Sequence, residues 1–305
     1  MKLSFKTPAK INLGLHIQRK REDGYHELET LLQMVTLYDE IELESLAAGI
    51  ELECDAPGIP RDDTNLVVRA ARLLADGYPG RGAGVRIRLH KHIPSGAGLG
   101  GGSGNAAGVL MGLNVLWDMK LKREDLLPLA GRLGADVPFF LTAPCALGKG
   151  RGDILSPIQT TGKFWVLLIY PQFPIATSWV YQNLNFKLTN RVNHISILKK
   201  FLSESQVAGL GEHLCNDLEP VVLQRYPVIQ AIKEELVSQG AKGALLSGSG
   251  STVFGIFDSP GQAKSAYAKL DKGGGGLFLT ETVTSFTEFW PDAMLNYPGV
   301  SKGTP

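Results

Sequence analysis

The chain has 305 residues, 44% of them hydrophobic and 20% charged, and its formal net charge is +1. A chain of this size and composition can bury a sizeable core without disulfides or metals, and its length suggests two domains. The near-zero net charge gives no reason to expect nucleic acid or a membrane surface as a partner.

The cysteines and the first residues indicate the cellular compartment. Cys54, Cys145 and Cys215 are far apart and odd in number, which is typical of reduced, buried thiols rather than of a disulfide framework. The first ten residues carry charge throughout and lack the apolar core of a signal peptide. The longest apolar runs, such as 164–170, are too short to span a bilayer. We therefore expect a cytoplasmic protein.

The first predicted element is a strand over 10–17, where apolar residues alternate with others. Lys10 and Asn12 lie two residues apart on it and therefore point the same way. A turn at 22–24 precedes Tyr25 and His26, and a second alternating run covers 39–44.

A helix is expected over 66–74, since Asp63-Thr64-Asn65 resembles a helix start. Val85–Leu89 predicts a strand, and six glycines follow between Gly96 and Gly104. The next helix should run to about Trp117, with Ala106, Leu110, Leu113 and Trp117 on one face. A further helix over 123–133 precedes the segment Gly134-Ala-Asp136-Val-Pro138.

A shift in composition near 148–162 predicts a boundary between an N-terminal domain, 1–157, and a C-terminal domain, 158–305. The second half should contain a strand over 164–170 and helices near 195–202 and 227–239. Residues 243–257 read as strand, glycine turn and strand, with Gly248 and Gly250 in the turn. The polar tail after about residue 291 is expected to be loose.

The glycine segment admits several interpretations. A Walker A loop needs a lysine that this segment lacks. A dinucleotide fingerprint matches at Gly96, Gly98 and Gly101, but the acidic residue at the right distance, Asp118, ends a helix rather than a second strand. A flexible linker is disfavoured by the apolar residues on both sides. What remains is a different phosphate loop, built from backbone N–H groups at a helix N-terminus.

The segment Pro94-Ser-Gly-Ala-Gly-Leu-Gly-Gly-Gly-Ser103, followed by Asn105-Ala-Ala, resembles the ATP loop of the GHMP kinases. That family is named for galactokinase and the homoserine, mevalonate and phosphomevalonate kinases. Pro8-Ala-Lys10-Ile-Asn12 resembles its first motif, and Ser247-Gly-Ser-Gly-Ser-Thr252 resembles its third. The resemblance implies a two-domain α/β fold of the α+β type, an active site in the interdomain cleft, ATP as phosphoryl donor and Mg²⁺.

Four segments resemble one branch of that family. They are Asp23-Gly-Tyr25-His26, Gly134-Ala-Asp136-Val-Pro138, Asn216-Asp-Leu-Glu-Pro220 and residues 247–254. The resemblance implies that ATP phosphorylates the tertiary C2 hydroxyl of a methylerythritol that carries a cytidine diphosphate group, in the non-mevalonate route to isoprenoid precursors. Alternatives are another GHMP kinase, such as homoserine kinase, and a non-catalytic nucleotide-binding module.

The resemblance also implies which residues bind ATP. They are Asn65, Pro94, Gly96, Gly98, Leu99, Gly100, Gly101, Gly102, Ser103 and Gly104. Ser103 is in addition a candidate Mg²⁺ ligand. Gly104 departs from the family, which usually has a second serine there; the change leaves backbone binding intact but removes one hydroxyl.

Asp136 is the candidate catalytic base, because transfer to an alcohol needs a group that accepts or orients its proton. The alternative is a helix N-cap two residues before Pro138. Lys10 would hold Asp136 as a carboxylate and offset charge on the transferred phosphoryl, unless it is an ordinary exposed lysine. Asn12 would position the acceptor hydroxyl. The resemblance favours the catalytic role for Asp136 and Lys10.

The resemblance implies that Tyr25, His26 and Tyr181 recognise the cytosine ring. Aromatic faces accept any base, so selectivity would come from hydrogen bonds to the edge of the ring. Trp179 is a rival for the second stacking position. His90 and His92 would share one strand face, but a metal site needs further ligands, so we interpret them as a solvated face.

Overall fold

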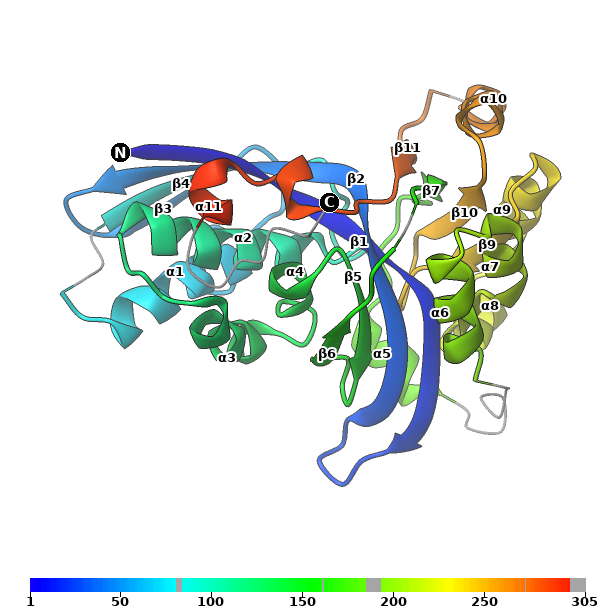
Figure 1. The fold of residues 1–305 in the computed structure, drawn as a ribbon, viewed down its shortest axis with the longest axis horizontal. Helices are drawn as coiled ribbons and strands as arrows, with labels where there is room; N and C mark the ends of the chain where they lie inside the picture. The colour runs from blue at the N-terminus through cyan, green and yellow to red at the C-terminus, as the bar shows by residue number, and fades with distance from the viewer. Residues whose placement is uncertain (81–83, 161, 185–192, 272, 297–305) are drawn as a thin grey trace.

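The computed structural model describes residues 1–80, 84–160, 162–184, 193–271 and 273–296. In the N-terminal half the strands are β1 (Lys2–Lys20), β2 (His26–Leu46), β3 (Ile50–Cys54), β4 (Gly84–His90), β5 (Cys145–Lys149) and β6 (Ile154–Pro157). Its helices are α1 (Leu66–Gly77), α2 (Gly101–Leu116), α3 (Arg123–Leu133) and α4 (Phe139–Thr142). Figure 1 shows these elements on the left and centre of the molecule.

The remaining elements form most of the second half. The strands are β7 (Trp165–Ile169), β8 (Cys215–Asn216), β9 (Gly243–Leu246), β10 (Val253–Phe257) and β11 (Leu277–Glu281). The helices are α5 (Thr177–Gln182), α6 (Ile195–Ser203), α7 (Val207–His213), α8 (Glu219–Arg225), α9 (Val228–Ser238), α10 (Pro260–Leu270), the 3₁₀ turn η2 (Phe286–Glu288) and α11 (Asp292–Leu295).

Two sheets carry the fold. The first has the order β3-β4-β2-β1-β8, with β5 and β6 attached through β2, and the second has the order β11-β7-β10-β9. The first mixes parallel and antiparallel pairs, whereas the printed pairs of the second are antiparallel. The predicted class, α/β of the α+β type, is confirmed.

β1 and β2 form a long antiparallel ribbon that runs through both halves (Figure 1). The pairing register shifts at Pro8/Ala9, at Asn12/Gly14 and at Ile17/Arg19, and such bulges bend and twist a ribbon. The middle of β1 is buried on both faces. Its apolar residues pack into the protein, while Lys10 and Asn12 face the central cavity.

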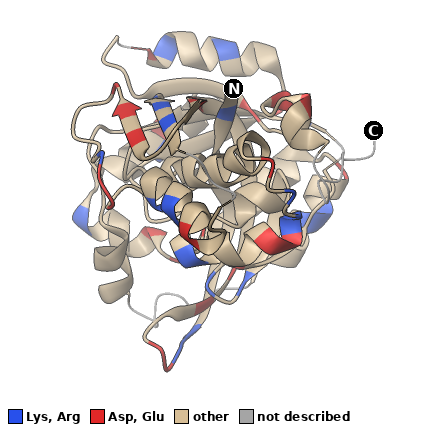
Figure 2. Cartoon of the chain, turned by 90° about the vertical axis from the view of Figure 1, so that its left-hand side faces the viewer, with Lys and Arg blue, Asp and Glu red and all other residues tan. Residues whose placement is uncertain are grey.

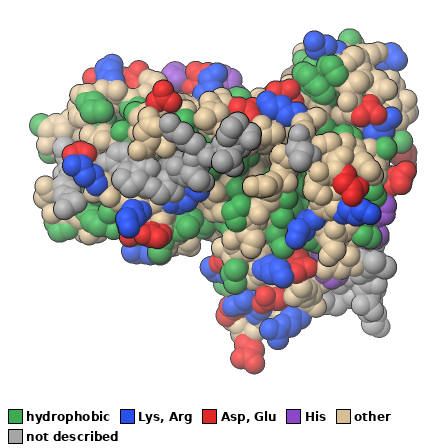
Figure 3. Space-filling model, viewed as in Figure 1, with side chains coloured by type: hydrophobic (Ala, Val, Ile, Leu, Met, Phe, Trp, Pro, Cys, Tyr) green, Lys and Arg blue, Asp and Glu red, His purple; other side chains and the backbone are tan. Residues whose placement is uncertain are grey.

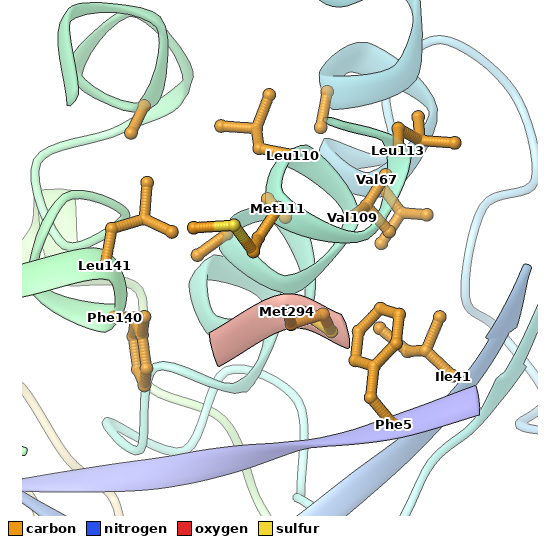
Figure 4. Packing of buried hydrophobic residues seen from close by; sticks show 14 of the residues in the cluster. Phe5, Ile41, Val67, Val109, Leu110, Met111, Leu113, Phe140, Leu141 and Met294 are labelled. Carbon is orange, nitrogen blue, oxygen red and sulfur yellow. The ribbon is translucent and has the colours of Figure 1, made fainter. Parts of the chain in front are cut away.

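Helix α2 is buried on nearly every side, which is more than the single apolar face that the sequence predicted. It contacts β1 and β2 on one side and α1, α3, α4 and α11 on others. Figure 4 shows Val109, Leu110, Met111 and Leu113 pointing in different directions from this helix into the surrounding core. Beyond its first turn, where Gly102 is exposed and Ser103 half-buried, the helix has no solvent face, and this packing holds it firmly in place.

The C-terminal segment returns to the first half. Residues Val283, Phe286, Phe289, Trp290, Met294 and Leu295 are buried in the same core as α2, and Figure 4 shows Met294 beside Phe5. The predicted loose tail is therefore wrong for 292–295, while 297–305 lie outside the described residues. The proposed boundary after residue 157 assigns this last segment to the second domain, although its buried residues pack in the core of the first half.

A second apolar cluster joins the halves. It combines Ile11, Leu13, Leu31 and Leu99 of the first half with Val166, Leu168, Leu198, Phe254 and Ile256 of the second. Because apolar residues of both halves share one core beneath the cavity, the cleft has a firmly packed floor.

The outer face of the first sheet is charged. Arg86 and Arg88 on β4 pair with Glu42 and Glu44 on β2 and with Glu51 and Glu53 on β3. Figure 2 shows basic and acidic residues side by side on strands of this half, and Figure 3 shows both signs interspersed on the face that it draws. Within the described residues, no helix has the length and hydropathy needed to cross a membrane.

Candidate active site

A cavity of about 890 Å³ lies where the two halves meet. Its wall is formed by the middle of β1, the start of β2, the glycine segment before α2, the loop at 135–136, the β5–β6 turn, α5 and the turn at 248–249. Because residues of both halves line it, it has the interdomain position that the sequence predicted.

Lys10, Asn12 and Asp136 meet in this cavity. Lys10 Nζ lies 3.7 Å from Asp136 Oδ2 and donates to Asn12 Oδ1 at 2.7 Å. Asn12 Nδ2 donates in turn to Thr30 Oγ1 at 2.8 Å on the neighbouring strand β2. The Lys10 side chain is only 5% exposed, whereas that of Asp136 is 44% exposed. A buried ammonium ion thus faces a carboxylate that opens to the cavity.

The capping alternative for Asp136 finds no support. Helix α4 has Pro138 as its N-cap residue and no side-chain cap hydrogen bond. Lys10 is likewise buried rather than an ordinary exposed lysine. Asp136 is therefore not a helix cap, and Lys10 is not an exposed surface lysine.

The glycine segment alternates left-handed glycines with buried apolar anchors. Gly96, Gly98 and Gly100 have φ of +67°, +78° and +67°, which favours glycine. Ala97 and Leu99, between them, are each 1% exposed. The Leu99 carbonyl accepts from the Lys10 N–H at 2.9 Å, so the segment is fastened directly to β1.

The turn at 247–252 packs against this segment from the second half. Ser247 Oγ donates to the Gly98 carbonyl at 3.0 Å, and the Thr252 N–H donates to the Ala97 carbonyl at 3.2 Å. A Cβ atom on Gly98 would lie 2.1 Å from the Ser247 carbonyl oxygen. Only glycine fits there, because the two backbones are already in contact.

Most of the residues expected to bind ATP line the cavity. They are Asn65, Pro94, Gly96, Gly98, Gly100, Gly101, Gly102 and Ser103. Leu99 and Gly104 are not on its wall: Leu99 is an anchor in the shared core, and a Cβ at Gly104 would meet the Pro8 carbonyl oxygen at 3.0 Å and the Phe140 ring at 3.2 Å. The missing serine at 104 therefore faces packed protein.

Asn65 both caps helix α1 and lines the cavity. Its Oδ1 accepts from the Val67 N–H at 2.9 Å as the N-cap of α1, and its Nδ2 donates to the Pro60 carbonyl at 2.7 Å. It also lines the cavity beside Pro60 and Leu66.

A buried polar network beneath the glycine segment was missed from the sequence. Asp39, which is 0% exposed, pairs with the Lys91 ammonium and accepts from Asn105 Nδ2 at 2.9 Å. Its other oxygen accepts from the N–H groups of His92 and Ile93 at 2.8 and 2.9 Å. The network fixes the chain that leads into the glycine segment. No motif marks it, because its members are 52 and 66 positions away from Asp39.

Tyr25, His26 and Tyr181 are brought to one end of the cavity. Tyr181 stacks on His26, with ring centroids 5.1 Å apart, while Tyr25 is 56% exposed. Burial, and next the negative charge of Asp136, raise the pKa of the Tyr181 hydroxyl. Burial and the charge of Lys20 lower the pKa of His26, which favours its neutral form.

The stacking arrangement differs in part from the expectation. The second aromatic of the sandwich, Tyr181, contacts His26, and the partner of the Tyr25 ring is the Arg151 guanidinium at 5.0 Å. Arg151 lines the cavity and also pairs with Asp153 at 2.7 Å. Sequence reasoning missed Arg151, since a single arginine in a glycine-rich turn carries no motif.

Trp179, the rival for stacking, is not among the residues that line the cavity. It packs edge-on against Tyr226 and lies under the Arg225 guanidinium. The histidine prediction also needs correction: β4 ends at His90, so His92 is not on the strand. His90 pairs with Asp55 at 3.0 Å.

None of the three cysteines forms a disulfide within the part of the chain that the structure describes. Cys54 and Cys145 are buried as predicted, whereas Cys215 is only half-buried. Burial raises the pKa of the Cys145 thiol to about 12.

Family profiles match both halves. Residues 65–143 match the GHMP kinases N terminal domain, and residues 194–275 match the GHMP kinases C terminal domain. The first match includes the glycine segment and Asp136, and the second includes the turn at 247–252.

Curated relatives match over most of their length. The 4-diphosphocytidyl-2-C-methyl-D-erythritol kinase of Syntrophus aciditrophicus is 45% identical over 272 residues, covering 89% of this chain and 96% of the relative. The kinase of the same name from Acetivibrio thermocellus is 38% identical over 281 residues, covering 92% and 99%.

Solved structures agree with these relatives. A 4-(cytidine 5'-diphospho)-2C-methyl-D-erythritol kinase has a TM-score of 0.79 and 34% identity, covering 92% of this chain and 99% of its own. Homoserine kinase from Cytophaga hutchinsonii has a TM-score of 0.73 at 19% identity, covering 93% and 95%. The second likeness shows the fold alone.

Proposed function

The chain belongs to the GHMP kinases and, within them, to the 4-diphosphocytidyl-2-C-methyl-D-erythritol kinases, and from this membership we propose how its cleft works. It is a small-molecule kinase that uses ATP to phosphorylate the C2 hydroxyl of 4-diphosphocytidyl-2-C-methyl-D-erythritol, in the non-mevalonate route to isoprenoid precursors. The homoserine kinase alternative has only the shared fold in its favour, and membership of a kinase family argues against a non-catalytic module.

The phosphates of ATP are bound by the glycine segment and the first turn of α2. Backbone N–H groups at a helix N-terminus favour an anion, and the helix dipole adds to this. The buried anchors Ala97 and Leu99 hold the segment in one shape before the nucleotide arrives, so little ordering is needed on binding. Asn65, Pro60 and Leu66 line the same cavity and would take the adenine end.

Asp136 receives or orients the proton of the acceptor hydroxyl. Its carboxylate opens to the cavity, as a general base must, and Lys10 lies 3.7 Å from it. The Lys10 ammonium stands where negative charge moves during transfer. Asn12, held by Lys10 and Thr30, presents its amide at the same point.

The residues present also fit Mg²⁺. Among the described lining residues, Asp136 is the one carboxylate, and Ser103 offers a hydroxyl at the start of α2. Mg²⁺ prefers such oxygen ligands and usually retains waters and substrate phosphates, so one or two protein ligands suffice. When bound, it would offset charge on the phosphates of ATP. We also propose that the enzyme needs Mg²⁺ and is located in the cytoplasm.

The cytidine diphosphate group occupies the other end of the cavity. Tyr25 and Tyr181 supply aromatic faces, and His26 supplies a polar ring edge. Arg151 and Lys20 line the same end and place positive charge where the diphosphate of the acceptor would lie. Anchoring this remote group helps to place the C2 hydroxyl beside Asp136.

The observation that carries the proposal is the Lys10–Asp136 pair, because Lys10 adjoins the glycine segment at Gly100 and the charge of Asp136 acts on the Tyr181 hydroxyl in the same cavity. The test is ADP release with Mg-ATP and, in parallel, the cytidylated alcohol, free methylerythritol, homoserine and mevalonate. We expect kcat/KM to be highest for the cytidylated alcohol by a wide margin. A higher value for homoserine or mevalonate would contradict the proposal.

A further inference from the structure

The segment Asn216-Asp217-Leu218-Glu219 is part of the family resemblance, yet the mechanism above assigns it no role. Its three polar side chains are almost fully buried: Asn216 is 2%, Asp217 3% and Glu219 7% exposed. Buried polar groups are retained only where partners satisfy them. The partners of these side chains lie on β1 of the first half and at the glycine turn of the second half.

The Asn216 side chain hydrogen-bonds to the backbone at the glycine turn of the second half. Its Nδ2 donates to the Leu246 carbonyl at 2.9 Å and to the Gly248 carbonyl at 2.8 Å, and its Oδ1 accepts from the Leu218 N–H at 2.9 Å. Glu219 accepts from the Leu246 N–H at 2.9 Å and pairs with Lys233. The two side chains thus bind both backbone groups of the residue that leads into the turn.

The same segment is fastened to β1. β8 pairs with β1 in parallel, matching Gly14 with Cys215 and Leu15 with Asn216. The Asp217 carboxylate accepts from the Ile17 N–H at 2.8 Å and lies 3.0 Å from His16 Nδ1. Asn216 is therefore a direct link between the strand that carries Lys10 and Asn12 and the turn that carries Gly248.

The turn at Gly248 lies beside Lys10 and Asn12 in the cavity. A Cβ atom on Gly248 would lie 3.2 Å from Asn12 Oδ1 and 3.3 Å from Lys10 Nζ. Gly248 and Ser249 line the cavity, whereas Asn216 does not. A shift of the turn would change the space beside Lys10 without removing any group that contacts substrate.

We propose that Asn216 is a positioning residue that holds the Gly248 turn against Lys10 and Asn12 and so fixes the geometry in which the acceptor hydroxyl meets the phosphoryl group. The inference deepens the proposed function and rests on it. It predicts an effect mainly on kcat, since displacement of groups around a reacting centre can lower the rate by up to ~10²-fold.

The variant that tests it is Asn216→Asp, which keeps the shape but replaces the donor with a carboxylate oxygen facing two carbonyls. At pH 8 we expect kcat for the cytidylated alcohol to fall by about 10- to 100-fold. A protonated carboxyl can again donate a hydrogen bond, and this buried carboxyl will bind its proton readily. The ratio of variant to wild-type kcat should therefore rise several-fold between pH 8 and pH 6.

Other titratable groups near position 216 are Asp217, Glu219, His16 on β1, Lys233 on α9 and Lys10 beside the turn. Because they are present in both proteins, dividing variant by wild-type kcat removes their contribution. A folded Asn216→Asp protein with wild-type kcat, or with a pH-independent ratio, overturns the proposal.

Asn114→Asp is the matched control. Asn114 is 0% exposed, and its amide bonds both backbone groups of Leu121 at the far end of α2. Its substitution should lower the melting temperature but leave kcat unchanged. If it lowers kcat as Asn216→Asp does, the effect is general destabilisation and the proposal is wrong.

A second variant covers the case in which Asn216→Asp does not fold. Asn216→Ser keeps a hydroxyl donor but has a shorter reach, so kcat should fall by about 10-fold with no recovery at low pH; wild-type kcat would overturn the proposal. Wild-type turnover of the cytidylated alcohol tests the proposed function separately, so failure of one is not confused with failure of the other.

Discussion

At the phosphate end of the cleft, backbone groups of the glycine segment face the cavity, and buried apolar residues and β1 hold them in place. At the acceptor end, the wall is made of side chains, among them Tyr25, which is 56% exposed. Lys10 adjoins the glycine segment at Gly100, and its partner Asp136 acts electrostatically on Tyr181, so we take this pair as the place where the two ends meet.

The proposed function accounts for this difference. Phosphates present the same oxygens in every nucleotide, and fixed N–H groups suffice for them. A cytidine diphosphate differs from other groups through its ring edge and its charge, which side chains can read. Substitutions at the phosphate end should therefore disturb backbone geometry, and those at the acceptor end should remove individual contacts.

The largest effect is expected where the two ends meet. Asp136→Asn should lower kcat by roughly 10²–10⁴-fold, the usual contribution of a general base, while leaving the affinity for ATP without Mg²⁺ and for the acceptor nearly unchanged. Steady-state kinetics with calorimetric binding of each ligand checks this. A variant within a few-fold of wild type would remove Asp136 from the chemistry.

At the phosphate end, Gly98→Ala should weaken ATP binding by roughly 10- to 100-fold, since the loss of one hydrogen bond to a charged phosphate costs about 1.5–3 kcal/mol. The new Cβ would lie 2.1 Å from the Ser247 carbonyl oxygen at a residue with φ of +78°, so the backbone must move. Calorimetry measures the affinity for ATP.

Gly131→Ala is the control for that substitution. Gly131 lies inside α3 with nothing within 4 Å of its added Cβ, so alanine should stabilise the helix by up to ~1 kcal/mol. Unchanged ATP affinity in a folded Gly98→Ala protein would show that the close backbone contact is not needed.

At the acceptor end, Tyr181→Ala should raise KM for the cytidylated alcohol by roughly 10-fold, because one stacked base contributes about 1–3 kcal/mol. KM for ATP should stay nearly constant. Tyr181→Phe keeps the aromatic face and should resemble wild type if stacking is the role. Equal losses in the two variants would instead assign the role to the hydroxyl.

The smallest effect is expected for Arg151→Ala, with KM for the cytidylated alcohol raised about 2- to 5-fold. Cation–π contacts at exposed sites contribute only ~0.5–1 kcal/mol, and the guanidinium is already paired with Asp153. Because the contribution is electrostatic, it should shrink as salt is added.

Arg225→Ala is the matched control for Arg151→Ala. Arg225 also lies over an aromatic ring, that of Trp179, but it does not line the cavity. A rise in KM of the same size for both variants would speak against a specific role of Arg151.

Local patterns in the sequence were sufficient for much of the site. Alternation placed Lys10 and Asn12 on one face of β1, and glycine spacing before an apolar run placed the glycine segment at the start of α2. Both signals lie within a few residues, where backbone geometry decides which side chains are neighbours. The family resemblance, rather than any pattern, singled out Tyr25, His26 and Tyr181.

Features that depend on distant residues were missed. Asp39 lies 66 positions from Asn105, and Arg151 reaches Tyr25 across the sheet. The enclosure of α2 depends on α11, nearly two hundred positions later in the chain. In each case the contact arises from packing between elements that are distant in the sequence, and no local pattern marks the residues that make it.

The returning C-terminal segment has a consequence for how the chain is made. The ribosome completes the first half early, yet Phe286, Trp290 and Met294 fill space between its elements. Domains usually fold as units during synthesis, the N-terminal one first. Here the first half cannot close its own core until Met294 and Leu295 have been synthesised, so the nascent chain must carry an open apolar surface until then.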